Sequence, residues 1–155
     1  EQGGEVTGSV TLRGQKSLIQ GYGFRDHAWG VRDWESMDHY DLAWPIFGSD
    51  FLFACTAITM KDGGKNQVGF LYDGKENLGI TARDLQLEFD DDGLTQKSIV
   101  LHLRDEKDRD WKVTGTRIAK FILPLDGFII NETMFEYRTQ EGRVGYGVSE
   151  RGIRL

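Results

Sequence analysis

Apolar and polar residues alternate along most of the chain, and no stretch keeps the period of a helix. An alternation with a period of two predicts strands with one buried and one wet face. We therefore expect an all-β protein. The expected strands are residues 6–12, 18–21, 51–60, 67–72, 78–81, 83–89, 98–104, 111–118, 121–123, 128–137 and 143–149.

Short runs that contain aspartate or glutamate and glycine separate these segments. They are residues 61–64, 73–74, 90–93 and 141–142. Glycine tolerates positive φ angles and aspartate bonds to its own backbone, so these runs predict hairpin turns. About ten short antiparallel strands favour a closed β-barrel over a sandwich, because closure removes the exposed edges. We expect a single domain over residues 1–155.

Two of the expected strands, residues 51–60 and 128–137, carry apolar residues on both faces. Such a strand lies between the barrel interior and a second layer, or it lines a cavity. Asn131 and Glu132 interrupt the apolar pattern, and we expect them to orient a ligand, unless one of them faces solvent. Tyr146 on the last strand is also expected to reach a ligand.

The composition limits the classes of partner that we expect for this protein. The 155 residues are 28% charged and 12% aromatic with a net charge of −6, so a packed core is expected and nucleic acid is not an expected partner. No apolar run approaches the ~20 residues of a membrane span, and the first residues have no signal-peptide pattern. We expect a cytoplasmic protein.

Residues 21–34 carry most of the chemical signal. They read Gly-Tyr-Gly-Phe-Arg-Asp-His-Ala-Trp-Gly-Val-Arg-Asp-Trp, which joins two tryptophans and a histidine to balanced arginines and aspartates. Surfaces rarely have this composition. We expect the segment to be an ordered, largely dry insertion that closes the barrel.

The stretch from Gly23 to Trp34, the later Trp44 and residues 145–150 resemble the tandem lipocalin-like proteins related to carotenoid 1,2-hydratase (hydroxyneurosporene synthase) and the AttH-like proteins. The resemblance implies a lipocalin-like (calycin-type) barrel that corresponds to the C-terminal one of two. An N-terminal barrel domain or a second copy is then the expected partner. It also implies an isoprenoid- or polyketide-like substrate and no cofactor. The implied site-forming residues are Asp26, His27, Trp29, Arg32 and Trp34.

Hydration of an alkene needs an acid that protonates carbon and walls that stabilise a cation. Asp26, if it is buried and its pKa is raised, is suited to act as this acid. His27 can set the protonation of Asp26 or position the attacking water. Trp29 and Trp34 offer ring faces to a positive charge. Arg32 and Trp44 complete the expected ligand contacts.

Two alternatives stay open. The charged residues of this segment can form a buried ion-pair lattice around tryptophan plugs, with no chemistry. The whole domain can likewise be a non-catalytic scaffold that packs against a partner.

Other chemistries find little support. The three histidines, at positions 27, 39 and 102, lack the spacing of metal ligands, so no metal is expected. Cys55 lies in an apolar run, which is typical of a packed, unreactive thiol. No third glycine completes a dinucleotide-binding pattern after Gly21 and Gly23.

Overall fold

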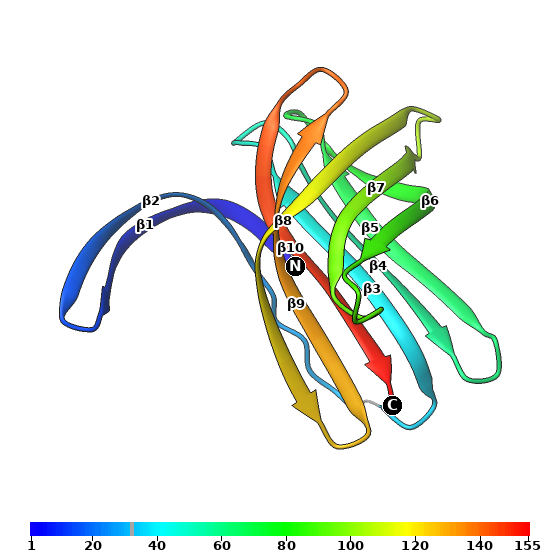
Figure 1. The fold of residues 1–155 in the computed structure, drawn as a ribbon. Coiled ribbons are helices and arrows are strands. Elements are labelled where there is room, and N and C mark those ends of the chain that lie inside the picture. The colour runs from blue at the N-terminus through cyan, green and yellow to red at the C-terminus, as the bar shows by residue number, and fades with distance from the viewer. Residues whose placement is uncertain (32) are drawn as a thin grey trace.

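The computed structural model describes residues 1–31 and 33–155. Within them the chain forms ten strands (Figure 1), and it contains no helix with the length and apolarity needed to cross a membrane. The strands are β1 (Gln2–Leu12), β2 (Gln15–Arg25), β3 (Met37–Ile46), β4 (Leu52–Met60), β5 (Lys65–Tyr72), β6 (Asn77–Phe89), β7 (Gln96–Asp105), β8 (Asp110–Leu125), β9 (Phe128–Thr139) and β10 (Val144–Arg154).

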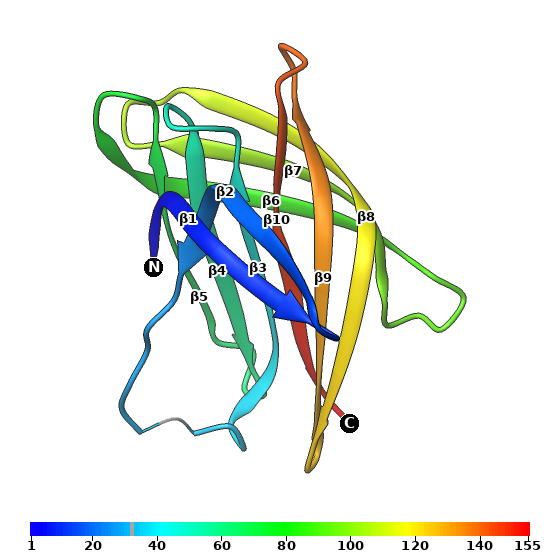
Figure 2. The same cartoon turned by 90° about the vertical axis from the view of Figure 1, so that its left-hand side faces the viewer.

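Strands β3 to β10 close into an antiparallel barrel in which each strand pairs with the next and β10 returns to β3, with Ser149 opposite Ala43. The all-β expectation is confirmed, but the expected barrel of about ten strands is wrong: the barrel has eight. Strands β1 and β2 form a separate hairpin that extends away from the barrel wall (Figures 1 and 2). Nearly all of its residues are exposed, because polar and glycine residues leave it no continuous apolar face to bury.

Three strand assignments need correction. Strand β3 was not expected, because Asp38, Asp41 and Pro45 disfavour a strand, yet Tyr40, Leu42 and Trp44 alternate along it. Two pairs of expected strands are continuous: residues 78–81 and 83–89 both belong to β6, and residues 111–118 and 121–123 both belong to β8. In each case a shift of register interrupts the alternation.

The four expected turns are confirmed. They join β4 to β5, β5 to β6, β6 to β7 and β9 to β10. Gly63, Gly74, Gly93 and Gly142 have φ angles between 66° and 89°, the region that side chains disfavour.

The barrel is filled at the end where β3 runs into β4. The inward side chains there form one apolar cluster, whose members are Ala43, Phe47, Phe51, Phe53, Cys55, Leu71, Leu78, Ile99, Leu101, Leu103, Val113, Phe135 and Tyr137. Gly145 makes room for one of these rings, since a Cβ there would lie 2.5 Å from Phe47. We call this half of the barrel the filled end.

A second apolar cluster lies on the outer face of the wall. Tyr40 and Leu42 of β3 pack there with Phe128 and Ile130 of β9, and Trp34 covers them. Strand β9 is thus apolar on both faces because it lies between the barrel interior and this outer layer, as one of the two interpretations of its sequence predicted.

Candidate functional site

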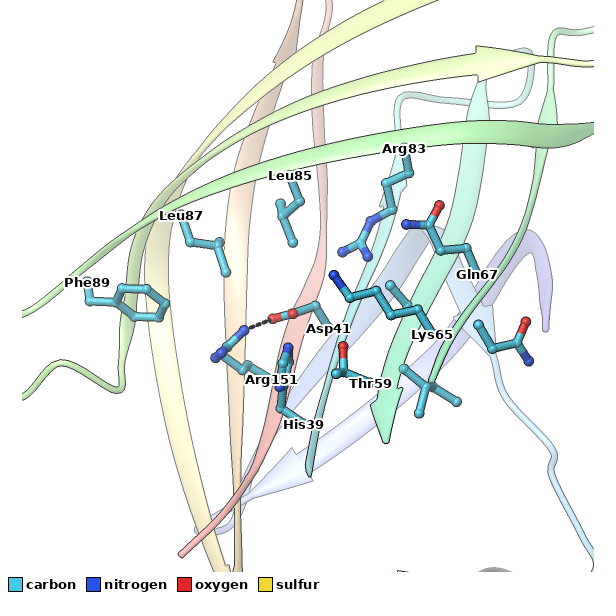
Figure 3. A pocket seen from close by; sticks show the side chains of 13 residues that line it. His39, Asp41, Thr59, Lys65, Gln67, Arg83, Leu85, Leu87, Phe89 and Arg151 are labelled. Atoms are coloured by element: carbon cyan, nitrogen blue, oxygen red, sulfur yellow. Dashed lines mark hydrogen bonds and ion pairs between the residues drawn. The ribbon is translucent and has the colours of Figure 1, made fainter. Parts of the chain in front are cut away.

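The barrel is hollow where β5 and β6 part. Their ladder has only three residue pairs, from Phe70 opposite Gly79 to Tyr72 opposite Asn77. Beyond these pairs a pocket of about 390 Å³ opens between the two strands and the facing parts of β3, β4 and β10 (Figure 3). This volume falls in the range of small-molecule sites.

One wall of the pocket is apolar. Leu85, Leu87 and Phe89 follow one another on the inward face of β6, and Figure 3 shows their side chains side by side along that strand. The period of two places them on one face. A ligand in the pocket therefore meets an extended apolar surface on this side.

The opposite wall is polar. Arg151 of β10 donates a hydrogen bond to the Asp41 carboxylate of β3 at 2.5 Å, and its guanidinium lies 5.6 Å from the centre of the Phe89 ring. His39 lines the pocket beside them, and its Nδ1 lies 2.7 Å from an Asp38 carboxylate oxygen. The Asp41 and Arg151 charges thus largely compensate each other.

Two further cations reach the pocket without such a partner. The ion pairs between described residues include neither Arg83 of β6 nor Lys65 of β5. The Nε and Nη2 atoms of Arg83 are buried and have no hydrogen-bond partner in the described chain. Figure 3 shows the Arg83 and Lys65 side chains pointing into the same space.

The boundary between the pocket and the filled end carries two groups that hold their protons. Burial raises the pKa of the Cys55 thiol to about 11, although the nearby Arg83 lowers it. Burial also raises the pKa of the Tyr137 phenol. Cys55 is therefore a packed thiol rather than a nucleophile.

Two amide side chains lie unpaired in the interior. Asn131 is 1% exposed and Gln96 is fully buried, and in the part of the chain that is described their amide atoms have no hydrogen-bond partner. Asn131 lies opposite Arg151 on the inward face, and Gln96 lies opposite Phe89. Both residues therefore neighbour residues that line the pocket, and buried polar groups without partners are rare in folded proteins.

The segment from Gly21 to Trp34 is not the dry insertion that its sequence predicted. Asp26, His27 and Trp29 lie after the end of β2 and are exposed, Trp29 at 82%. Their contacts are local: Arg25 bonds His27 across 3.0 Å, and the rings of His27 and Trp29 lie 5.0 Å apart. Arg32 lies outside the described residues. The expectation fails because no other part of the described chain packs over Asp26, His27 and Trp29.

The other expected site residues are spread over different surfaces. Trp34 and Trp44 belong to the outer layer, where Trp44 lies 6.1 Å from the Phe24 ring. Asn131 faces the interior, whereas Glu132, its neighbour, is exposed on the outer face. Tyr146 is also exposed, with its hydroxyl 3.3 Å from a Glu136 oxygen. The structure does not bring these residues into one site.

Arg83 and Lys65 were not singled out from the sequence. A signal was present, since Arg83 starts a run in which every second residue is apolar, ending at Phe89. An arginine on the apolar face of a strand is unusual and indicates a buried polar contact. Among the described residues no three acidic, histidine or cysteine side chains lie close enough to hold a metal ion.

An up-and-down barrel of eight strands with a pocket in one half is an architecture that lipocalins also have. Over residues 1–152 the chain matches a family described as a domain of unknown function, DUF7064, and it belongs to that family. No curated protein matches it in sequence.

Two solved structures share the fold. A crystal structure assigned as an AttH from Nitrosomonas europaea matches 95% of this chain with a TM-score of 0.61 and 13% identity. Kievitone hydratase from Nectria haematococca matches 94% with a TM-score of 0.53 and 13% identity. The chain covers only 48% and 49% of those two proteins. The relation to AttH-like proteins is thus confirmed at the level of the fold.

Proposed function

We propose that this chain is a lipocalin-like domain that binds a hydrophobic small molecule, isoprenoid- or polyketide-like, in the open half of its barrel. The observation that supports this most directly is the unequal filling of the interior. One half is packed with aromatic and aliphatic side chains, while the other holds a pocket of about 390 Å³ with an apolar wall on β6. A domain that served only as a scaffold would gain stability by filling that space.

The test is native mass spectrometry of the protein purified from its own host. A co-purifying molecule with an apolar body is the expected result, and filling the pocket with Ala57→Trp should release it. Ala57 lines the pocket, so the larger ring would occupy ligand space. A chain that emerges empty, and that also binds no retinoid or farnesyl compound added later, would contradict the proposal.

We further propose that this domain is one half of a cofactor-independent hydratase, isomerase or cyclase. Its likeness in fold to kievitone hydratase supports this, as does the fact that the chain covers about half of that protein. Asp26 would act as the acid, with His27 beside it, after a second barrel or a second copy covers the exposed segment. Burial by a partner disfavours the ionised form of a carboxyl group, and a proton donor needs the protonated form.

The acid role of Asp26 is tested in the complete protein by Asp26→Asn. We expect turnover to fall by at least about 100-fold, the usual contribution of a general acid. Turnover within a few-fold of the unsubstituted protein would remove Asp26 from the mechanism.

A second candidate function, a domain that packs against a partner without binding a ligand, is favoured by one observation. The outer face of β8 exposes Phe121 at 61% and Leu123 at 36%, next to Met134 of β9. Contiguous exposed apolar side chains of this kind mark interaction surfaces. The ligand experiment above separates the two functions.

A further inference from the structure

We propose that the ligand of the barrel pocket carries an anionic group, and that Arg83 and Lys65 bind it while its apolar body lies against Leu85, Leu87 and Phe89. This inference rests on the proposed function, since it names the class of molecule that the pocket takes. The predicted ligand is therefore an amphipathic anion rather than a neutral hydrocarbon.

The charges around the pocket are unbalanced. Its lining residues include three permanent cations, Lys65, Arg83 and Arg151, and a single carboxylate, Asp41. Asp41 is held by Arg151, with their atoms 2.5 Å apart. Among the described residues Lys65 and Arg83 pair with no carboxylate, although the net charge of the chain is −6 and acidic side chains are not scarce. An excess of positive charge in a concave site attracts anions.

The buried Arg83 guanidinium supports an anionic ligand most directly. Its Nε and Nη2 atoms are buried and have no oxygen or nitrogen acceptor among the described residues, and the Cys55 thiol that the guanidinium approaches is a weak acceptor. Leaving a charged donor in this state costs free energy, which a bound anion would recover. The two atoms lie on one edge of the guanidinium, the edge that pairs with two oxygens of a carboxylate or a phosphate.

The position of these two cations sets the orientation of a bound ligand. Arg83 lies on β6 and Lys65 on β5, about four and five residues beyond the last pair of the ladder, on the two sides of the gap between these strands. Figure 3 shows Gln67 beside them, and the apolar side chains of Leu85, Leu87 and Phe89 continue along β6 away from Arg83. An anionic group held between Arg83 and Lys65 would direct an apolar chain along β6.

The interior amide of Asn131 lies next to the pocket, beside the lining residue Arg151. Asn131 is 1% exposed, its amide atoms are unpartnered in the described chain, and it lies opposite Arg151 on the inward face. It is suited to a hydroxyl or carbonyl group at the far end of the ligand, because an amide both donates and accepts. The anion and this second polar group together would fix the ligand's direction.

The experiment compares pairs of probes with the same skeleton and different charge. Isothermal titration is carried out with retinoate and retinol, and with farnesyl monophosphate and farnesol. We expect the anion of at least one pair to bind at least about tenfold more tightly than its alcohol, as a charge-assisted contact allows. The pair that shows the preference distinguishes a carboxylate ligand from a phosphate ligand.

Substitutions test whether Arg83 and Lys65 cause the preference for the anion over the alcohol. Arg83→Gln and Lys65→Gln should each lower the affinity for the anion and leave the affinity for the alcohol within about twofold. Lys65 is exposed, so its substitution does not threaten folding. Lys16→Gln removes the same charge from the distant β1–β2 hairpin and should change nothing, and Arg83→Lys should restore part of the preference.

The outcomes separate this inference from the proposal on which it rests. Equal binding of anion and alcohol, unchanged in Arg83→Gln, would overturn the anionic ligand and leave the ligand-binding barrel standing. A loss of anion binding in Lys16→Gln as large as in Lys65→Gln would reduce the effect to net charge and also overturn it. Binding of none of the four probes would count against the proposed function itself.

Discussion

Asp105 forms the centre of a buried hydrogen-bond network at the filled end of the barrel. Its carboxylate accepts bonds from Trp111 Nε1 at 3.0 Å and from Arg109 Nε at 2.8 Å, as well as from two backbone N–H groups. Arg109 continues the network to Asp73 at 3.0 Å, which ties the turn after β7 to the turn after β5. Burial alone would raise the pKa of Asp105, but these hydrogen bonds outweigh it and lower the pKa from 3.8 to about 2.

The network predicts a loss of stability in acid. Because the folded pKa of Asp105 lies below its unfolded value, its stabilisation is complete above about pH 4 and declines as the pH falls from 3.8 towards 2. Asp105→Asn removes this titration. It should cost roughly 2 kcal/mol at neutral pH and weaken the acid dependence of the unfolding free energy, measured by urea denaturation.

A surface ion pair of the same hairpin provides the control. Asp110 pairs with Arg104 at 2.9 Å, and both side chains are more than half exposed. Asp110→Asn should therefore change the unfolding free energy by less than about 1 kcal/mol. An Asp105→Asn protein as stable as this control would show that the network contributes little.

The β1–β2 hairpin differs from the other strand pairs because it contacts the barrel only near its base, where Gly3 lies against Leu52 and Phe24 against Trp44, among the described residues. Leu18 is 85% exposed, and few residues of β2 approach β3. An isolated two-stranded sheet is marginally stable in water. Val6, Val10 and Leu12 recur on one face of β1, which predicts a strand, but only the pairing shows that Gly21, Ser17 and Gln15 of β2 lie opposite them and interrupt the apolar face.

Hydrogen exchange should distinguish the hairpin from the barrel. In the free chain we expect the backbone amides of β1 and β2 to exchange at least about 100-fold faster than those of β4 and β9, whose inward residues are buried or half-buried. Mass spectrometry of peptides that cover residues 2–25 and 52–60 measures the difference. Equal protection would mean that the hairpin is packed against something in solution, and dilution would tell whether that is a second copy.

At the scale of the whole molecule, the outer face of β8 predicts association. Phe121, Leu123 and Leu125 share this face with Ile130 of β9, and β8 is exposed along its second half. We expect the chain to self-associate in sedimentation experiments at high concentration. Phe121→Lys with Leu123→Lys should reduce this association without lowering the thermal midpoint, because the replaced side chains are exposed.

Thr114→Lys with Thr116→Lys is the matched control for that experiment. Both threonines are exposed on β8, and their replacement adds the same charges without removing apolar surface. Association that falls equally in both double variants would be a charge effect. Association that persists in both would place the contact elsewhere, and the hairpin would be the next surface to examine.

Much of the fold follows from the sequence, because alternation and turn chemistry act locally. The period of two and the Asp-Gly and Gly-Gly turns were enough to predict an antiparallel all-β chain and its hairpins. The apolar pattern of residues 128–137 predicted either a strand between the interior and a second layer or a strand that lines a cavity, and the structure shows the first at Phe128 and Ile130.

Other features were decided only by the tertiary structure. Eight strands close the barrel and two leave it, because closure depends on which strands can bury an inward face together. The density of chemical groups in residues 21–34 suggested a buried site, but burial depends on what packs over a segment, and no other part of the described chain covers Asp26 or Trp29. Arg83 and Lys65 are 18 positions apart in sequence and reach the same pocket only because β5 and β6 diverge after three residue pairs.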